Sequence, residues 1–244
     1  QRLDLSDRVQ ALGQLGLSEA LRQTGARDDA LAAIDEAIRL VPNFAPAYLS
    51  RAAVRLSLDA PSGAIADASQ AIDLDRRNPA GYLLRAEAYL REGLPAFALG
   101  DLDEAVTIAP NVAHIRLVRA YANLALERTD RALSDANVAL KLEPDMVSAY
   151  LLRTRIYMRI GQFARAGANA GRAVDLAPDD RAAQDAATIA YTELARFEPA
   201  RRAADKLVAL APANPDALNA RCWVLALTTD PASALADCDA AIAA

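Results

Sequence analysis

The sequence repeats itself every 34 residues, and this period restricts the chain to a stack of similar units. Prolines mark the register, because each follows an apolar ending of the same kind, such as "AVTIAP"; they are Pro42, Pro110, Pro144, Pro178 and Pro212. Arg76 stands where one more proline would be and keeps the frame. We therefore divide the chain into repeats 11–44, 45–78, 79–112, 113–146, 147–180, 181–214 and a shortened 215–244. No linker interrupts them, so we expect one domain over residues 1–244.

The positions within a repeat, numbered here as columns 1 to 34, predict two helices. Column 20 is alanine in every repeat, and column 27 is alanine in all but one. Together with columns 24, 28 and 31 they follow helical spacing and form a buried stripe. The chain is 53% apolar but only 5% aromatic and is rich in alanine, the best helix former. We predict an all-α protein in which helix A, columns 2–14, and helix B, columns 18–31, form stacked antiparallel hairpins.

These columns resemble the tetratricopeptide repeat (TPR) family. Column 8 is small in most repeats, as in Ala52, Ala86 and Ala120, and tyrosines recur at columns 4 and 11, as in Tyr82 and Tyr89. The resemblance covers residues 11–244 and implies a right-handed superhelix, an α-solenoid that binds proteins rather than catalysing a reaction. The strong preference for Arg over Lys is typical of a GC-rich, bacterial genome.

Two further columns vary together. Column 7 is arginine in five repeats, and column 23 is Asp or Asn in the same five; Leu17 with Ala33 and Ala187 with Ala203 are the exceptions. Because columns 7 and 23 face each other across a hairpin, we expect structural Arg–carboxylate bridges. The expected pairs are Arg51 with Asp67, Arg85 with Asp101, Arg119 with Asp135, and Arg221 with Asp237. The alternative, an arginine ladder for an anionic ligand, would not require Asp to disappear together with Arg.

The two cysteines, Cys222 and Cys238, occupy columns 8 and 24 of the last repeat, which also face each other. Two interpretations remain open: a disulfide that closes the terminal hairpin, or two buried thiols that act as small apolar side chains. A disulfide would favour the periplasm or cell envelope, and free thiols the cytoplasm.

The resemblance implies that the A helices line a concave groove. The groove columns are unusually apolar, and part of this surface is expected to be plain core between repeats. Tyr121, Met158 and Trp223 are of the residue types that anchor partners. The expected partner-binding residues are Leu49, Leu83, Glu87, His114, Leu117, Tyr121, Leu124, Leu151, Arg155, Met158, Ile189 and Trp223.

Charge and motifs exclude other functions. A net charge of −5 and a pI of about 5.0 argue against nucleic-acid binding. No apolar run is long enough for a membrane span. His114 is the single histidine, and no catalytic motif, metal site or cofactor site is visible, so we expect no enzyme activity.

The sequence therefore predicts a scaffold that binds a peptide or protein partner on its concave face. The alternative is an oligomerisation or regulatory module from a larger bacterial envelope protein. The last repeat has no polar capping helix, which is consistent with a longer protein or with self-association through this repeat.

Overall fold

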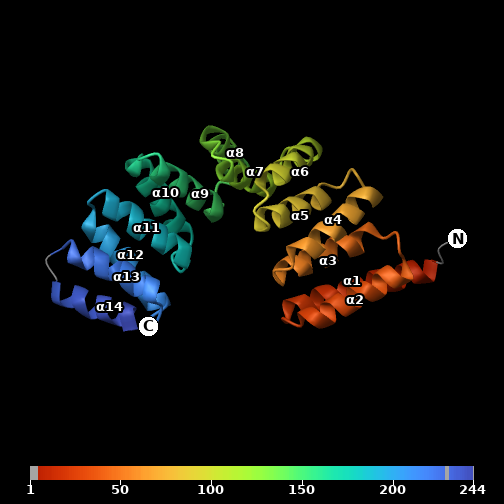
Figure 1. Cartoon of the computed structure of the whole chain (residues 1–244), viewed down its shortest axis with the longest axis horizontal. Helices are drawn as coiled ribbons and strands as arrows, with labels where there is room; N and C mark the ends of the chain where they lie inside the picture. Colours follow the sequence, from red (N-terminus) through yellow and green to blue (C-terminus); the bar gives the residue numbers. More distant parts are fainter. Residues whose placement is uncertain (1–4, 229–230, 244) are drawn as a thin grey trace. The chain divides into compact units, whose positions relative to one another are not determined.

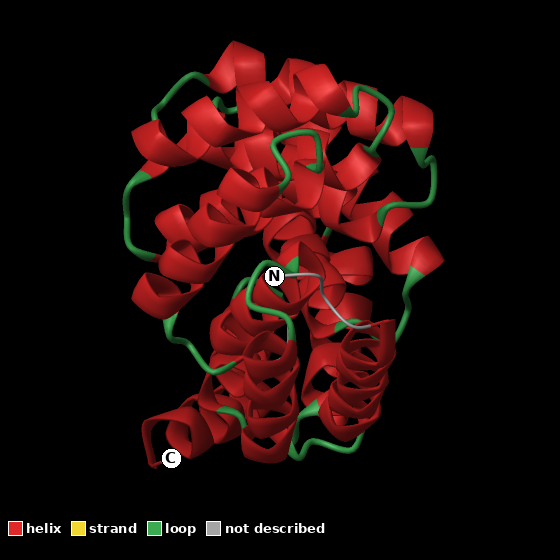
Figure 2. Ribbon diagram, turned by 90° about the vertical axis from the view of Figure 1, so that its right-hand side faces the viewer, coloured by secondary structure: helices red, strands yellow, loops and turns green. Residues whose placement is uncertain are grey.

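A computed structural model describes residues 5–228 and 231–243, which form fourteen α-helices and no strand (Figure 1). Short loops join the helices (Figure 2). In chain order the helices are α1 Leu5–Gln23, α2 Arg27–Leu40, α3 Ala45–Ser57, α4 Pro61–Leu74, α5 Pro79–Arg91, α6 Pro95–Ile108, α7 Ala113–Ala125, α8 Thr129–Leu142, α9 Val147–Arg159, α10 Phe163–Leu176, α11 Arg181–Glu193, α12 Phe197–Leu210, α13 Pro215–Ala226 and α14 Pro231–Ala243. The predicted all-α hairpin architecture is confirmed.

Odd-numbered helices are the A helices of the repeats and even-numbered helices are the B helices. From α2 to α13 each begins and ends about one residue earlier than predicted. Proline explains several of the starts. Pro79 and Pro95 are the first residues of α5 and α6, where a fixed φ suits the helix and a missing N–H costs nothing. The N-caps Asn78 and Asp180 also accept a hydrogen bond from a first-turn backbone N–H.

Each A helix from α1 to α11 is followed by a residue in the left-handed conformation at column 15. Gly25, Gly93 and Gly161 have φ of 83°, 72° and 70°, the conformation in which glycine commonly ends a helix. The same column also has positive φ where it is not glycine, at Asp59, Glu127 and Ala195. The turn between helices A and B is therefore set by the fold, and glycine is only its least strained occupant.

The chain divides into two compact units, Gln1–Arg128 with α1–α7 and Thr129–Ala244 with α8–α14. Within each unit, consecutive A helices pack on one another: α1 on α3, α3 on α5 and α5 on α7 in the first, α9 on α11 and α11 on α13 in the second. Consecutive B helices make no such contacts among the described residues. The A helices therefore line the inner, concave side of each unit, and the B helices diverge on its outer side.

Alanine makes this close packing possible. The column-20 alanines are fully buried in the first six repeats and nearly so at Ala234 in the last. Leu102, Ile115 and Leu152 are among the largest fully buried side chains. Because the core consists of many small contacts between neighbouring helices, each repeat depends on the next for burial. No helix in the described ranges is long and apolar enough to cross a membrane.

Candidate functional site

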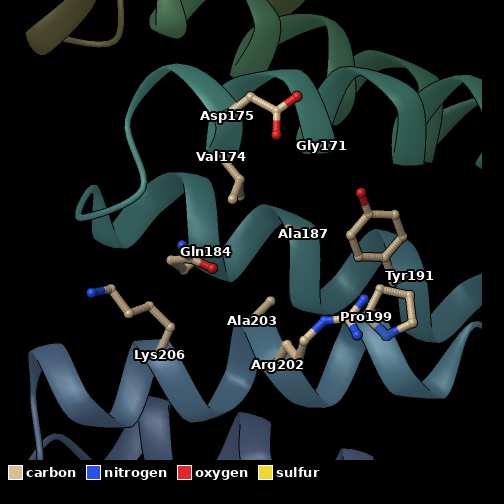
Figure 3. Close-up of a pocket in the computed structure, with 10 residues that line it drawn as sticks. All are labelled: Gly171, Val174, Asp175, Gln184, Ala187, Tyr191, Pro199, Arg202, Ala203 and Lys206. Carbon is tan, nitrogen blue, oxygen red and sulfur yellow. The ribbon is translucent and has the colours of Figure 1, made fainter.

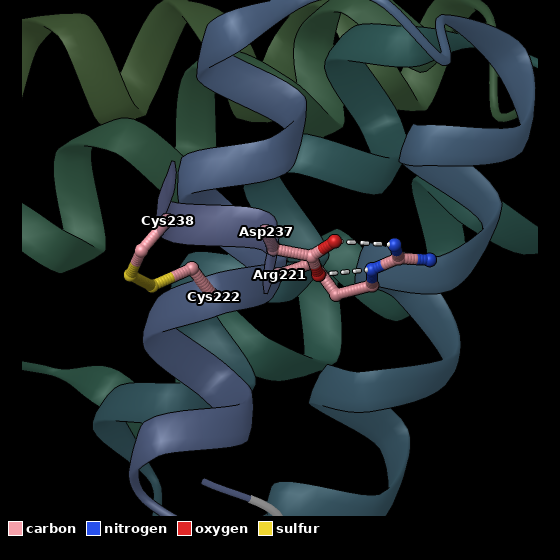
Figure 4. Close-up of a disulfide and its surroundings, with 4 residues drawn as sticks. All are labelled: Arg221, Cys222, Asp237 and Cys238. Atoms are coloured by element: carbon pink, nitrogen blue, oxygen red, sulfur yellow. Dashed lines mark hydrogen bonds and ion pairs between the residues drawn. A yellow bond between two sulfur atoms is a disulfide. The ribbon is translucent and has the colours of Figure 1, made fainter. Parts of the chain in front are cut away.

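The column-7 arginines contact the column-23 aspartates of their own hairpins. Arg85 donates from Nε and Nη2 to the two oxygens of Asp101, each at 2.7 Å. Arg221 does the same to Asp237 at 2.6 and 2.7 Å (Figure 4). These bonds raise the pKa of both guanidinium groups above the ordinary value. Both aspartates are buried, so the bridges are planar, charge-assisted and largely shielded from water.

A second contact, which the sequence analysis missed, connects the same arginine to the preceding repeat. Arg51 binds Asp67 of its own hairpin at 2.6 Å and also donates from Nη1 to Asp35, at column 25 of the previous B helix, at 2.6 Å. Arg85 reaches Ser69, at the same column, at 3.0 Å. Each arginine therefore lies between two consecutive B helices and joins them.

The same connection recurs in other repeats. Arg119 donates to Asp103 at 2.9 Å, and Arg221 lies 3.5 Å from Asp205, both at column 25 of the preceding repeat. Polar side chains at columns 7 and 25 of adjacent repeats were the signal for this link. Arg119 belongs to the first unit and Asp135 to the second, so their bridge stays a prediction.

Repeat 5 departs from the pattern because its column 23 is Asn169 rather than aspartate. The Asn169 amide donates to the carbonyl oxygen of Arg165 at 2.7 Å. The Arg153 guanidinium lies 5.8 Å from the centre of the Tyr157 ring, and its buried Nε has no hydrogen-bond partner. A neutral amide does not attract the arginine as a carboxylate does.

Cys222 and Cys238 form a disulfide that joins α13 to α14, with their Cα atoms 5.4 Å apart (Figure 4). The Arg221–Asp237 bridge lies directly beside it, one residue earlier on each helix. The terminal hairpin is thus connected by one covalent and one ionic link at the same level. The sequence left open a disulfide or two buried thiols, and in the structure the two cysteines form the disulfide.

The predicted groove residues fall into three groups. Leu117 and Leu124 are only 4% and 5% exposed, so the expectation that they contact a partner is wrong. At these two positions the side chain faces neighbouring helices rather than the groove, and Leu83 likewise packs in part against the core cluster that contains Ile115 and Val118.

The second group is partly buried and consists of Leu49, Leu83, Glu87, Tyr121, Leu151 and Met158. Met158 packs against the cluster around Tyr157 and Ala166. Glu87 lies 3.0 Å from the exposed ring of His114, so the single histidine pairs with an acid on the preceding A helix, α5. The side chains of this group therefore contribute both to the core between repeats and to the surface.

The third group is exposed and includes Arg155, Ile189 and Trp223, which occupy column 9 of α9, α11 and α13. Ile189 is 46% exposed and Trp223 is 62% exposed, although both are large and apolar. Since α11 packs on both α9 and α13, these three side chains follow one another along the inner side of the second unit.

An acidic pocket lies between α11 and α13. It has a volume of about 290 Å³ and is lined by Arg181, Asp185, Asn214 and Asp216, among others. Partial desolvation raises the pKa of Asp185, and the nearby Asp216 raises it further, whereas Arg181 opposes the shift. The lining of this pocket thus contains two acidic side chains, Asp185 and Asp216, and one basic side chain, Arg181.

No group of three or more potential metal ligands occurs among the described residues. The arrangement offers exposed apolar side chains and unbalanced charge, which are means of recognition.

The sequence matches no protein-family model and no curated protein. Solved structures similar to this chain include the APC/C hetero-tetramer Cut9–Hcn1, with a TM-score of 0.77 and 15% identity over 93% of this chain and 45% of that chain. The chain thus spans less than half of that protein. A tetratricopeptide repeat protein from Parabacteroides merdae has a TM-score of 0.71 and 15% identity over 96% of this chain and 93% of that one.

A third similar structure is YrrB, described as a TPR protein with an unusual peptide-binding site. It has a TM-score of 0.57 and 20% identity over 78% of this chain and 97% of that chain. At such identities the likeness establishes the architecture alone. The chain therefore has the tetratricopeptide repeat fold, an all-α solenoid of stacked helix hairpins.

Proposed function

We propose that the protein is a non-enzymatic scaffold that binds a polypeptide partner on the concave, A-helix side of its second unit. The observation that carries this proposal is the exposure of Ile189 and Trp223 at the same column of two packed helices. Tryptophan is the residue type most enriched among side chains that dominate binding energy. Two exposed, large apolar side chains at the same column of packed helices support a binding surface more than a single scattered apolar residue would.

The acidic pocket defines the chemistry of the partner. Asp185 and Asp216 lie on the same two helices as Ile189 and Trp223. The raised pKa of Asp185 means that a positive charge placed there would be favoured. We therefore infer a segment that combines apolar side chains with a lysine or arginine.

Two of the similar structures support this class of function. YrrB is described as having a peptide-binding site, and Cut9 is part of a hetero-tetramer. Those properties belong to the other proteins, and the proposal for this chain depends on its own residues.

The test is selection of binders from a random peptide library displayed on phage. We expect selected peptides to combine apolar and basic residues, and Trp223→Ala to weaken their binding at least about tenfold. Phe97→Ala is the matched control, because Phe97 is 63% exposed but lies on the B helix α6 of the other unit. Peptides that bind both variants equally well, or a library that yields no binder, would contradict the proposal.

Self-association is a second candidate, favoured by α14. Leu235 and Ile242 on this helix are 64% and 85% exposed. Burial of both against a second copy would remove apolar surface from water. Sedimentation equilibrium of the chain and of Leu235→Glu/Ile242→Glu tests it: we expect a concentration-dependent dimer that the substitutions abolish, and a monomer for both proteins would exclude it.

A further inference from the structure

A pocket of about 390 Å³ lies on the outer side of the second unit, between the B helices α10 and α12 and above α11 (Figure 3). It occupies the place that a column-7 arginine fills at other junctions. Its lining includes Ala187 at column 7, Ala203 at column 23 and Gly171 at column 25 of the preceding repeat. These are the three positions that form the polar link between repeats elsewhere.

At the last junction, between repeats 6 and 7, polar side chains fill the corresponding positions. There Arg221 binds Asp237 at 2.6 Å and approaches Asp205 at 3.5 Å, from the same three columns. At the junction between repeats 5 and 6 all three side chains are reduced to a methyl group or a hydrogen. Because the neighbouring B helices do not pack on each other, nothing else among the described residues closes the gap.

Gly171 has a specific role in shaping this pocket. A Cβ at this position would lie 2.5 Å from the hydroxyl oxygen of Tyr191. Glycine therefore admits the Tyr191 hydroxyl, which points toward α10 in Figure 3, and no hydrogen bond within the protein occupies that hydroxyl in the described part of the chain. The pocket thus gains a donor where other repeats have a column-25 side chain.

This junction lacks a column-7 arginine but has a positively charged residue at another column. Arg202 occupies column 22, where every other repeat has a small residue: Ala32, Ala66, Gly100, Ser134, Ala168 and Ala236. Its guanidinium has no ion-pair partner among the described residues. Lys206, on the same helix, is by contrast held by Asp179 at 2.6 Å. Arg202 is therefore a cation that lacks the carboxylate which column-7 arginines usually have.

Acceptors lie on the other walls. Asp175 of α10 lines the pocket from the wall opposite α12 and has no ion-pair partner in the described ranges (Figure 3). On the floor, Gln184 is only 4% exposed and donates from Nε2 to the carbonyl oxygen of Pro178 at 2.7 Å. Its side-chain oxygen receives no hydrogen bond from the described residues and remains an acceptor at the pocket.

We propose that this pocket binds a small zwitterion of the amino-acid class. Arg202 would bind its carboxylate and Asp175 its ammonium group, and the Tyr191 hydroxyl and the Gln184 oxygen would add hydrogen bonds. The pocket is large enough for such a ligand, because a single water molecule takes up only about 30 Å³ in the liquid. The site is independent of the proposed partner surface, because it lies on the outer side of the unit, so either proposal can fail alone.

The experiment is calorimetric titration of the full chain at fixed ionic strength with the ω-amino acids from glycine to 6-aminohexanoate. This series spans the separations of the two charges. We expect saturable binding of at least one member, and binding at least about tenfold weaker for the butyrate or butylammonium analogue with only one charge. No heat from any member at about 10 mM would overturn the proposal.

Variants separate this site from general ionic association. Arg202→Ala should abolish binding without loss of stability, because alanine occupies column 22 in most other repeats. Arg201→Ala is the control, since Arg201 is adjacent in sequence but pairs with Asp205, 3.8 Å away. Ala187→Arg/Ala203→Asp should fill the pocket, abolish binding and raise Tm. Binding that survives Arg202→Ala or the filled pocket would also overturn the proposal.

Discussion

At the scale of single residues, the column-7 arginine is a structural link rather than a ligand ladder. Exposed ion pairs contribute little, but here the aspartate is buried and the guanidinium binds both of its oxygens. The same arginine also reaches the preceding B helix, so one side chain connects two repeats. The paired loss of Arg and Asp in repeat 6 follows, because a buried aspartate without its arginine is costly.

The buried bridge predicts a non-additive mutant cycle at Arg85 and Asp101. Arg85→Ala should lower the free energy of unfolding by roughly 2 kcal/mol, since it leaves a buried carboxylate without its partner. Arg85→Ala/Asp101→Ala, which reproduces the residues of repeat 6, should be more stable than Arg85→Ala. Urea denaturation measures both, and strictly additive effects would contradict the bridge.

Because the pKa of Asp185 is raised, replacing its carboxylate should stabilise the fold to an extent that depends on pH. Because the folded-state pKa lies above the usual 3.8, the folded state binds its proton more tightly than the unfolded state does. Ionisation of Asp185 therefore destabilises the fold above that pKa, and the penalty vanishes below about pH 3.8. Asp185→Asn should raise Tm by about 1–2 °C at neutral pH and leave it unchanged near pH 3. An equal shift at both pH values would assign the effect to something other than this carboxylate.

At the scale of helices, the turn at column 15 imposes the left-handed conformation on whatever residue stands there. Ala195 has φ of 53°, a conformation that strains alanine but not glycine. Ala195→Gly should stabilise the protein by about 0.5–1 kcal/mol, because alanine is strained in this region. Ala168→Gly, on the exposed face of α10, should destabilise it by a similar amount. Thermal unfolding of the two variants should therefore give shifts of opposite sign, and two shifts of the same sign would refute this account of the turn.

The terminal hairpin, α13 with α14, should depend on its disulfide. Closing a loop of this size contributes about 3 kcal/mol, by restricting the unfolded chain. Cys222→Ala/Cys238→Ala should speed amide hydrogen exchange in α14 and leave exchange in α9 and α10 unchanged. Unaltered protection in α14 would mean that the Arg221–Asp237 bridge and apolar packing hold the hairpin without the disulfide.

At the scale of the whole molecule, periodicity made the fold predictable. Prolines, column-20 alanines and column-15 glycines each identify a helix start, a helix contact or a turn, so the hairpins follow from local residues. The surface was less predictable, because columns describe one repeat and burial depends on its neighbours. Leu117 and Trp223 both belong to groove columns by sequence, yet one is buried and the other exposed.

The contacts between repeats could not be predicted from the sequence for the same reason. The role of a column-25 side chain becomes apparent only when the arginine of the following repeat is placed beside it, as for Asp35 with Arg51. The exceptions at Ala187 and Ala203 were visible in the sequence, but the pocket at that junction required the geometry of the diverging B helices.

The most direct test of partner binding uses Trp223, the single tryptophan of the chain. A selected peptide that combines apolar and basic residues is titrated while the tryptophan emission is recorded. We predict a saturable blue shift, because the exposed indole becomes buried under the peptide, and loss of binding in Ile189→Asp. A peptide that binds without changing the emission, and equally well to Ile189→Asp, would show that the partner surface lies elsewhere.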